Sequence, residues 1–471
     1  MLLAACGKKV ETIYIISTND IHATIDAMPK LATLIKSYET KGEVVVVDSG
    51  DRVSGNAYVD DATESGMPII ELMNTVGYDI VTLGNHEFDK GKEALATMVQ
   101  GSDFEWLCAN ITTEVAGCKF AASKRITLLG VDLGFVGVVS TDNNGYPLGK
   151  RSTYEGITFS HDLTTAISTC EAIAPECDFV VLLSHMGLDV DKRLSEQTSA
   201  CNWVAGGHSH NRISADFNNT HISQNNKNIR YATVATLSVY DGSIISVDYE
   251  QIDISTVEED EATRELVDRV KLSDPTLNEV VAQANDDATH TGVANLTVEA
   301  LKSFSYPDGF VPEVVFYHLG GVRLSEIKAG DIRRVDILNN DPFLSTIYIG
   351  EMTPQQMRDF ILEKYNSGTS ENPDKESHYP YFRSNVPYQI ILGSEPATKP
   401  DATRIELKLE EGRKYRVAMC NYIAESYIDK TIVESQLHDT EISVREALMN
   451  HIESFRESGY TPDNTLYQTE L

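Results

Sequence analysis

Five short apolar runs, rich in β-branched residues, lie in the first 210 residues, and each is followed at once by a polar cluster. The runs cover residues 13–17, 44–47, 80–83, 179–183 and 203–205. Runs of this length, bounded by Gly, Asp and Asn, are typical of buried β-strands. Helix-like stretches such as 28–39 and 68–76 alternate with them. We therefore expect the N-terminal half to be a layered α/β domain.

The polar clusters contain the residues that can carry chemistry. They hold, in chain order, Asp20 and His22, then Asp51, then Asn85, His86 and Asp89, then His185, and finally His208 and His210. In an open α/β sheet, ligands bind beyond the carboxyl ends of the strands. We therefore expect these side chains to lie close together.

This mixture of side chains is suited to two divalent ions. Two ions about 3.5–4 Å apart can clamp the attacking and leaving oxygens of a displacement at phosphorus, and a carboxylate such as Asp51 can bridge them. Asp20 and His22 are two residues apart, as are His208 and His210, so each pair projects to one side of an extended segment. Mixed nitrogen and oxygen ligands favour Zn, Mn, Fe or Co over Ca or Mg.

His86 is expected to act on the substrate. It follows the potential ligand Asn85 and points the opposite way in an extended segment. If a helix begins here, Asp89 lies on the same face three residues later and can orient the imidazole. A protonated His86 could then stabilise developing charge or protonate the leaving oxygen.

The order of these motifs resembles that of the calcineurin-like metallophosphoesterases, and residues 85–89 (NHEFD) look like the 5′-nucleotidase branch, of the bacterial periplasmic 5′-nucleotidase/UDP-sugar hydrolase type. Residues 320–323, 328–332 and 342–343 look like the substrate-binding domain of that branch. The resemblance implies a four-layer αββα sandwich as the catalytic domain (residues 10–290). It also implies a connecting helix (291–306) and a C-terminal α+β substrate-binding domain (307–471).

The resemblance also implies roles for individual residues. Asp20, His22, Asp51 and His210 would hold one ion, and Asp51, Asn85, His185 and His208 the other. His86 and Asp89 would form the catalytic pair. Arg323 would bind the phosphate, and Phe382 and Tyr422 would stack on the base, with Arg383 and Asn421 beside them.

Two departures from the branch concern the substrate. His318-Leu319 stands before the Gly-Gly pair where the family has Asn or Arg, and the Gly-Gly-Asp-Gly turn is replaced by residues 423–428, where Glu425 is a speculative substitute for the ribose-binding Asp. The expected activity is removal of phosphate from nucleoside 5′-monophosphates by attack of a metal-bound hydroxide. The alternatives are a 2′,3′-cyclic nucleotide phosphodiesterase, a UDP-sugar pyrophosphohydrolase, and a non-catalytic lipoprotein that binds a phospho-ligand.

Charge and the N-terminus restrict partners and location. The chain has 71 acidic and 39 basic residues, a formal net charge of −32, which argues against a nucleic-acid duplex and leaves a nucleotide or other small phosphorylated substrate. Residues 3–6 (LAAC) resemble a lipobox, so residues 1–9 are interpreted as a lipoprotein signal remnant or linker. A lipid on Cys6 would hold the protein at a membrane surface of the bacterial cell envelope, lipid-anchored or periplasmic.

The cysteines leave two possibilities open. The pairs Cys108/Cys118 and Cys170/Cys177 are close in sequence and could form disulfides in an envelope compartment, whereas free buried thiols would fit the same spacing. The chain contains no CxxC motif, so a thiolate zinc site has no support.

Overall fold

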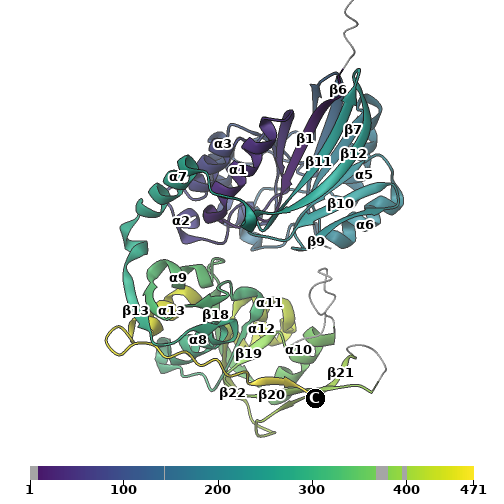
Figure 1. Cartoon of the computed structure of the whole chain (residues 1–471). Coiled ribbons are helices and arrows are strands. Elements are labelled where there is room, and N and C mark those ends of the chain that lie inside the picture. The colour runs from purple at the N-terminus through teal and green to yellow at the C-terminus, as the bar shows by residue number, and fades with distance from the viewer. Residues whose placement is uncertain (1–8, 143, 367–379, 395–399) are drawn as a thin grey trace, which may run out of the picture. The chain divides into compact units, whose positions relative to one another are not determined.

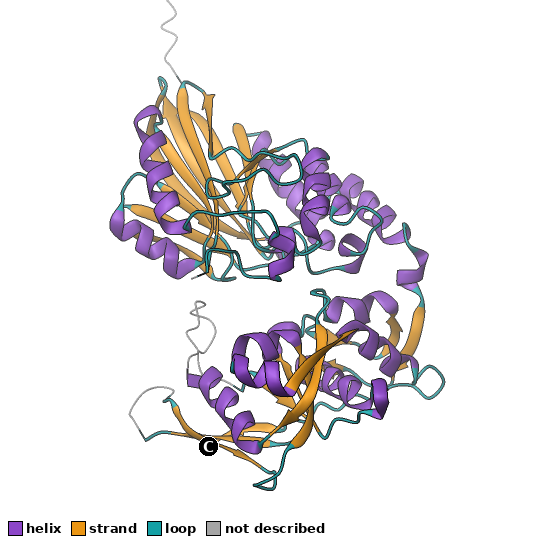
Figure 2. Cartoon of the chain, turned by 180° about the vertical axis from the view of Figure 1, so that it is seen from behind, coloured by secondary structure: helices purple, strands orange, loops and turns teal. Residues whose placement is uncertain are grey.

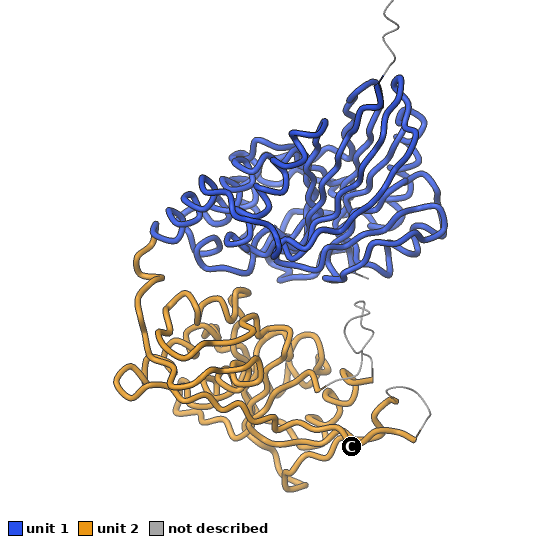
Figure 3. The backbone as a smooth tube through the Cα atoms, in the orientation of Figure 1, with its two compact units in different colours: residues 1–273, 371–374 blue, residues 274–370, 375–471 orange. Residues whose placement is uncertain are grey.

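The computed structural model describes residues 9–142, 144–366, 380–394 and 400–471 (Figure 1). Among these residues the chain forms two compact units, one ending at Ser273 and the other beginning at Asp274 (Figure 3). The lipidation site Cys6 expected from the sequence lies outside the described residues.

The first unit contains two six-stranded sheets (Figure 2). The first sheet has the order β12 (Ser243–Asp253), β11 (Tyr231–Tyr240), β1 (Glu11–Thr18), β2 (Glu43–Asp48), β3 (Ile80–Thr82) and β4 (Glu105–Leu107). The second has the order β5 (Ser123–Leu128), β6 (Val131–Val139), β7 (Phe179–His185), β8 (Trp203–Gly206), β10 (Thr220–Asn225) and β9 (Arg212–Phe217). The five predicted runs fall in β1, β2, β3, β7 and β8.

Apolar side chains from both sheets form one core between them, including Ile15, Val47, Phe135, Leu183 and Trp203. A second core lies between the second sheet and the helices α5 (Asp162–Ile173) and α6 (Leu188–Gln197). On the other side of the first sheet, the helix α1 (Met28–Glu39) packs against β2. The helices α3 (Met67–Val76) and α7 (Glu261–Leu272) pack against α1 and against each other. The short α2 (Ala57–Asp60) and α4 (Gly91–Gln100) complete the unit. This arrangement confirms the predicted αββα sandwich.

Parallel pairing brings the polar clusters to one edge. β1 pairs in parallel with β2, β2 with β3, β6 with β7, and β7 with β8. The carboxyl ends of β1, β2 and β3 therefore lie at one edge of the first sheet, and those of β7 and β8 lie at one edge of the second.

The second unit is α+β. Its main sheet has the order β19 (Phe382–Ser384), β15 (Val314–His318), β22 (Tyr415–Cys420), β18 (Thr346–Met352) and β23 (Leu437–Ser443), and a smaller one has β21 (Ala402–Leu407), β20 (Tyr388–Leu392) and β24 (Gln468–Glu470). Two short pairs join β13 (Val280–Ala284) with β17 (Gly330–Arg333) and β14 (Ala288–Thr289) with β16 (Glu326–Ile327). The helices are α8 (His290–Ser303), α9 (Arg334–Asn340), α10 (Pro354–Asn366), α11 (Asn421–Tyr427), α12 (Lys430–Gln436) and α13 (Val444–Glu453).

A helix is present in the range 291–306, where one is expected from the sequence. It corresponds to α8, whose side chains Val293, Leu296, Val298 and Leu301 are buried in the core of the second unit. A helix that is apolar on several sides is a core helix. The two compact units divide before α8, at Ser273/Asp274.

The described cysteines Cys108, Cys118, Cys170, Cys177, Cys201 and Cys420 are all free thiols, so of the two possibilities left open by the sequence the structure has free thiols. None of the described helices combines the length and apolar character needed to cross a membrane.

Candidate metal centre

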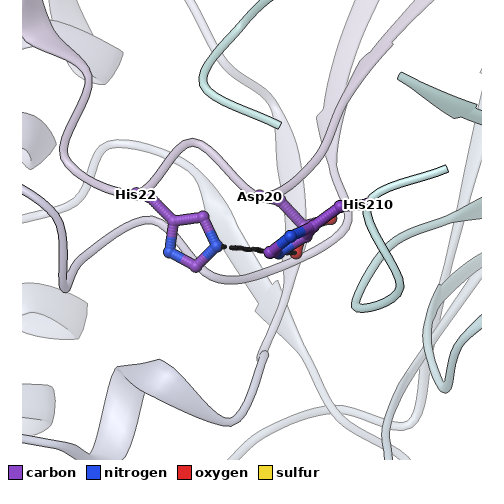
Figure 4. Close-up of side chains that lie close together, drawn as sticks. All are labelled: Asp20, His22 and His210. Atoms are coloured by element: carbon purple, nitrogen blue, oxygen red, sulfur yellow. Dashed lines mark hydrogen bonds and ion pairs between the residues drawn. The ribbon is translucent and has the colours of Figure 1, made fainter. Parts of the chain in front are cut away.

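The loops after β1 and β8 bring Asp20, His22 and His210 together (Figure 4). The Nε2 atoms of His22 and His210 lie 3.1 Å apart, and His210 Nε2 lies 3.3 Å from Asp20 Oδ1. Asp20 and His22 are buried. These three side chains are the ones assigned to one ion, together with Asp51.

A second cluster contains Asp51, His185 and His208. His185 Nε2 lies 3.0 Å from Asp51 Oδ2, and His208 Nδ1 lies 3.0 Å from Asn85 Oδ1. The structure thus brings together the four residues assigned to the other ion. Asp51 also forms a group with His22 and His86, so this carboxylate reaches toward both clusters, as a bridging ligand requires.

The hydrogen bonding of His185 tests whether a cation fits. Its Nδ1 lies 2.6 Å from the carbonyl oxygen of Ser49, which can only accept a hydrogen bond, so Nδ1 carries the proton. In the neutral ring Nε2 then presents a lone pair to the Asp51 carboxylate. Burial lowers the pKa of His185, but the negative charge of Asp51 outweighs burial and raises it to about 10. A metal ion between these two atoms would satisfy both, so the residues fit a metal.

The pKa of His208 moves the other way. Burial and the positive charge of His185 lower it to about 4. Its imidazole is therefore neutral near pH 7, which is the form that binds metals.

Most of these residues are not in extended backbone, which differs from the alternation expected from the sequence. Asp20, His22, Asp51, His208 and His210 have φ values of 50°, 45°, 61°, 76° and 57°. Such left-handed conformations are uncommon outside glycine, with Asn, Asp and His enriched among the exceptions. The turns send His208 and His210 to different clusters instead of the same side.

The predicted helical start places His86 beside Asp89. Residues His86–Phe88 form a 3₁₀ turn, and His86 Nδ1 lies 2.7 Å from Asp89 Oδ2. The backbone N–H of His86 donates to Asp51 Oδ1 at 2.9 Å, and His86 Nε2 lies 3.9 Å from Asp51 Oδ2. The ring is therefore oriented by Asp89 on one side and faces the metal ligands on the other.

A buried ion pair beneath the centre was not predicted from the sequence. Glu87, 1% exposed, accepts the backbone N–H groups of Asp51 at 3.0 Å and Arg52 at 2.7 Å, and that of Gly84. The Arg52 guanidinium donates to Asp48 at 2.7 Å, its Nη2 lies 3.6 Å from Glu87 Oε1, and it lies 4.3 Å from the centre of the Trp106 ring. Glu87 thereby ties the loop carrying Asp51 to the loop carrying Asn85. In the sequence, the one indication of this role is that Glu87 belongs to the motif at residues 84–87 (GNHE) and has no role as a ligand or in the catalytic pair.

Removing the Glu87 carboxylate is expected to destabilise the first unit. Glu87→Ala leaves three buried backbone N–H groups without their acceptor, while the Arg52 guanidinium keeps Asp48, so the free energy of unfolding should fall by about 3–5 kcal/mol. Urea unfolding of chelator-treated protein measures it. The control is Glu93→Ala, which changes an exposed residue on α4. Equal stability of the two variants would contradict the stabilising role of Glu87.

Two of the substrate-binding residues predicted in the second unit, Phe382 and Arg383, are buried. Phe382 is 1% exposed and packs against Phe360 and Tyr427 in the core, which leaves no face of its ring for a base and corrects the prediction for this residue. Arg383 is also buried, and its Nη1 donates to the Pro380 carbonyl at 2.7 Å.

The other three predicted residues, Arg323, Asn421 and Tyr422, are half-buried. Tyr422 is half-buried, with its ring centre 4.4 Å from that of His318. The Asn421 Oδ1 atom is buried without a hydrogen-bond partner among the described residues. Arg323 is half-buried and lies 4.7 Å over the Phe343 ring. Burial, with the nearby charges of Arg323 and Lys364, lowers the pKa of His318 to about 3, so His318 is neutral.

Comparisons with known proteins agree with this geometry. Residues 13–212 match the family model of the calcineurin-like phosphoesterases, and residues 266–429 match that of the 5′-nucleotidase C-terminal domain. The chain is 24% identical to the trifunctional nucleotide phosphoesterase protein YfkN of Bacillus subtilis, over 87% of this chain and 31% of YfkN. It is 26% identical to the 5′-nucleotidase of Bos taurus, over 41% of this chain and 37% of that protein.

The chain therefore spans only about a third of the length of these curated relatives. Among solved structures, the 5′-nucleotidase precursor from Thermus thermophilus superimposes with a TM-score of 0.78 at 19% identity, covering 98% of this chain and 99% of that one. This likeness supports the fold.

Proposed function

We propose that the chain removes phosphate from nucleoside 5′-monophosphates, because residues 13–212 match the family model of the calcineurin-like phosphoesterases and residues 266–429 match that of the 5′-nucleotidase C-terminal domain. The coarser statement, a metal-dependent phosphoester hydrolase, rests on both family models and on the 5′-nucleotidase relative. The observation that carries the proposal is the pair of neighbouring Asp/His clusters, Asp20/His22/His210 and Asp51/His185/His208, which are linked because Asp51 also forms a group with His22 and His86.

Seven side chains would hold two divalent ions. Asp20, His22, Asp51 and His210 would hold one, and Asp51, Asn85, His185 and His208 the other. When bound, the ions activate water and offset the negative charge of the phosphate. Imidazole and carboxylate ligands together favour Zn, Mn, Fe or Co.

His86 would donate a proton to the leaving oxygen. Its Nδ1 is held by Asp89, and this leaves Nε2 as the atom that meets the substrate. Asp89 fixes the orientation of the ring through this contact, as a general acid requires.

The second unit would recognise the nucleoside and phosphate. Tyr422 and Tyr381 are half-buried, whereas Phe382 is 1% exposed, so the first two are the aromatic residues that we propose contact a base. Aromatic stacking tolerates different bases, so we do not restrict the nucleotide to one base. Arg323 would bind the phosphate through its forked donors.

The second candidate is hydrolysis of 2′,3′-cyclic nucleotides or UDP-sugars. The observation that favours it is the segment Asn421–Tyr427, which is a helix here in place of the family's glycine-rich turn. Glu425, the possible substitute for the ribose-binding Asp, is bound by the Tyr348 hydroxyl at 2.9 Å. A site without that carboxylate would discriminate less strictly among leaving groups.

A substrate comparison tests both candidates. Purified protein should release phosphate from AMP faster than it opens 2′,3′-cyclic AMP or cleaves UDP-glucose. EDTA should abolish turnover, and Mn or Zn should restore it, because every proposed step depends on the ions. Faster cleavage of either alternative substrate would move the assignment to that substrate. Turnover insensitive to chelation, or no turnover with added metals, would contradict a metal-dependent hydrolase.

A further inference from the structure

We propose that Ser54 is a positioning residue of the catalytic pair: its hydroxyl fixes Asp89, and Asp89 fixes His86. This inference rests on the proposed function, since it concerns how His86 is held to donate its proton.

The three side chains form a short chain of hydrogen bonds. Ser54 Oγ donates to Asp89 Oδ2 at 2.5 Å, and His86 Nδ1 lies 2.7 Å from the same oxygen. Ser54 is 1% exposed, whereas Asp89 and His86 are partly exposed. Because one oxygen of the Asp89 carboxylate contacts both Ser54 and His86, the carboxylate loses most of its freedom to rotate. Its hydrogen bond to the imidazole therefore keeps a fixed direction.

Ser54 is itself held firmly by its backbone. It has a left-handed φ of 66°. The buried carboxylate of Asp60 accepts the N–H groups of Ser54 at 2.8 Å, Gly55 at 2.7 Å and Asn56 at 2.9 Å. Uncommon conformations persist where the surroundings over-determine them, and such positions cluster at functional sites.

The loop that carries Ser54 also packs against a predicted metal ligand. The N–H of His22 donates to the Asp51 carbonyl at 2.9 Å, and the N–H of Ala23 donates to the Arg52 carbonyl at 2.7 Å. At Gly55 a Cβ atom would lie 2.1 Å from the His22 carbonyl oxygen, so only glycine permits this approach. Ser54 therefore sets the position of Asp89 relative to the loop that holds the ligands.

The test uses two phosphate esters that differ in their need for a proton. The leaving group of p-nitrophenyl phosphate departs without much protonation, whereas that of AMP requires it. Ser54→Ala should lower kcat for AMP by about 10-fold and for p-nitrophenyl phosphate by less than about 3-fold, because misplacing a general acid matters most for poor leaving groups. The bound metal content should not change.

Ser65→Ala is the matched control. Ser65 lies in the same segment, and its Oγ donates to the Asp60 carbonyl at 2.8 Å without touching Asp89. It should change neither substrate's kcat. In an Asp89→Asn background, Ser54→Ala should have no further effect, since the two residues act in series. Equal slowing of both esters by Ser54→Ala, or no slowing of either, would overturn the positioning role.

A spectroscopic measurement separates this inference from the proposed function. A proton held between His86 Nδ1 and Asp89 should give a downfield imidazole NMR signal that disappears in His86→Ala. Ser54→Ala should shift that signal and Ser65→Ala should not. If AMP proves not to be a substrate, this signal still decides the role of Ser54, and an unshifted signal would refute it.

Discussion

Replacing Asp51 with asparagine is expected to lower kcat/KM for phosphoester hydrolysis by about 10³-fold or more, since a metal site supplies several kcal/mol of transition-state stabilisation. Asp51 lies within reach of both His22 and His185. Asparagine keeps its size but removes the charge, so at least one of the two ions should be lost. Kinetics, together with metal analysis of the dialysed protein, measures both effects.

The control for this change is Asp189→Asn, an exposed carboxylate on α6. It should keep full activity and metal content. An Asp51→Asn protein that binds two ions with wild-type affinity would show that this carboxylate does not bridge them.

Replacing His86 with alanine is expected to lower kcat by about 10²–10⁴-fold while the metal content stays the same, which is the usual contribution of a general acid. His86 differs in this respect from its neighbour Asn85, whose Oδ1 points to His208. Asn85→Ala should therefore lose metal as well as rate, whereas His86→Ala should lose rate alone.

Parallel measurements of rate and bound metal distinguish these two variants. His161→Ala, a change of an exposed histidine before α5, should affect neither. Loss of metal in His86→Ala, in proportion to the loss of rate, would assign His86 to the ligands instead of the catalytic pair.

The sandwich and the meeting of the clusters could be predicted from the sequence because parallel strands end at a common edge. The apolar runs at 13–17 and 44–47 are buried strands, and the positions of Asp20 and Asp51 follow from where those strands stop. The separation of His208 from His210 could not be predicted in this way. It depends on left-handed turns, and the alternation rule holds only for extended backbone.

The ion pair of Arg52 and Glu87 was missed for a different reason. Arginine and glutamate are almost never fully buried unless they are paired, and the sequence gives no sign of which partners will meet. Arg52 follows the predicted ligand Asp51 and Glu87 follows the predicted catalytic residue His86, and nothing in this spacing shows that the side chains of Arg52 and Glu87 are buried.

Tyr381 and Phe382 are adjacent aromatic residues, and the sequence alone does not show which of their two rings is buried. Successive residues of a strand point to opposite faces, so a shift of one residue exchanges the buried ring for the accessible one. Phe382 begins β19 and enters the core, and Tyr381 precedes it. The sequence identifies an aromatic segment here but not which ring a ligand could touch.

The left-handed turns at the centre also limit how this protein can change over evolutionary time. At His22, His208 or Asp51, a replacement must supply a donor atom and also tolerate a positive φ. Asn and Gly tolerate the backbone but weaken or remove the ligand, and β-branched residues tolerate it poorly. Few single substitutions lead from this centre to one with other ligands. A new metal preference is more accessible through Asn85 or His185, whose backbone lies outside the left-handed region, so directed libraries belong at those two positions.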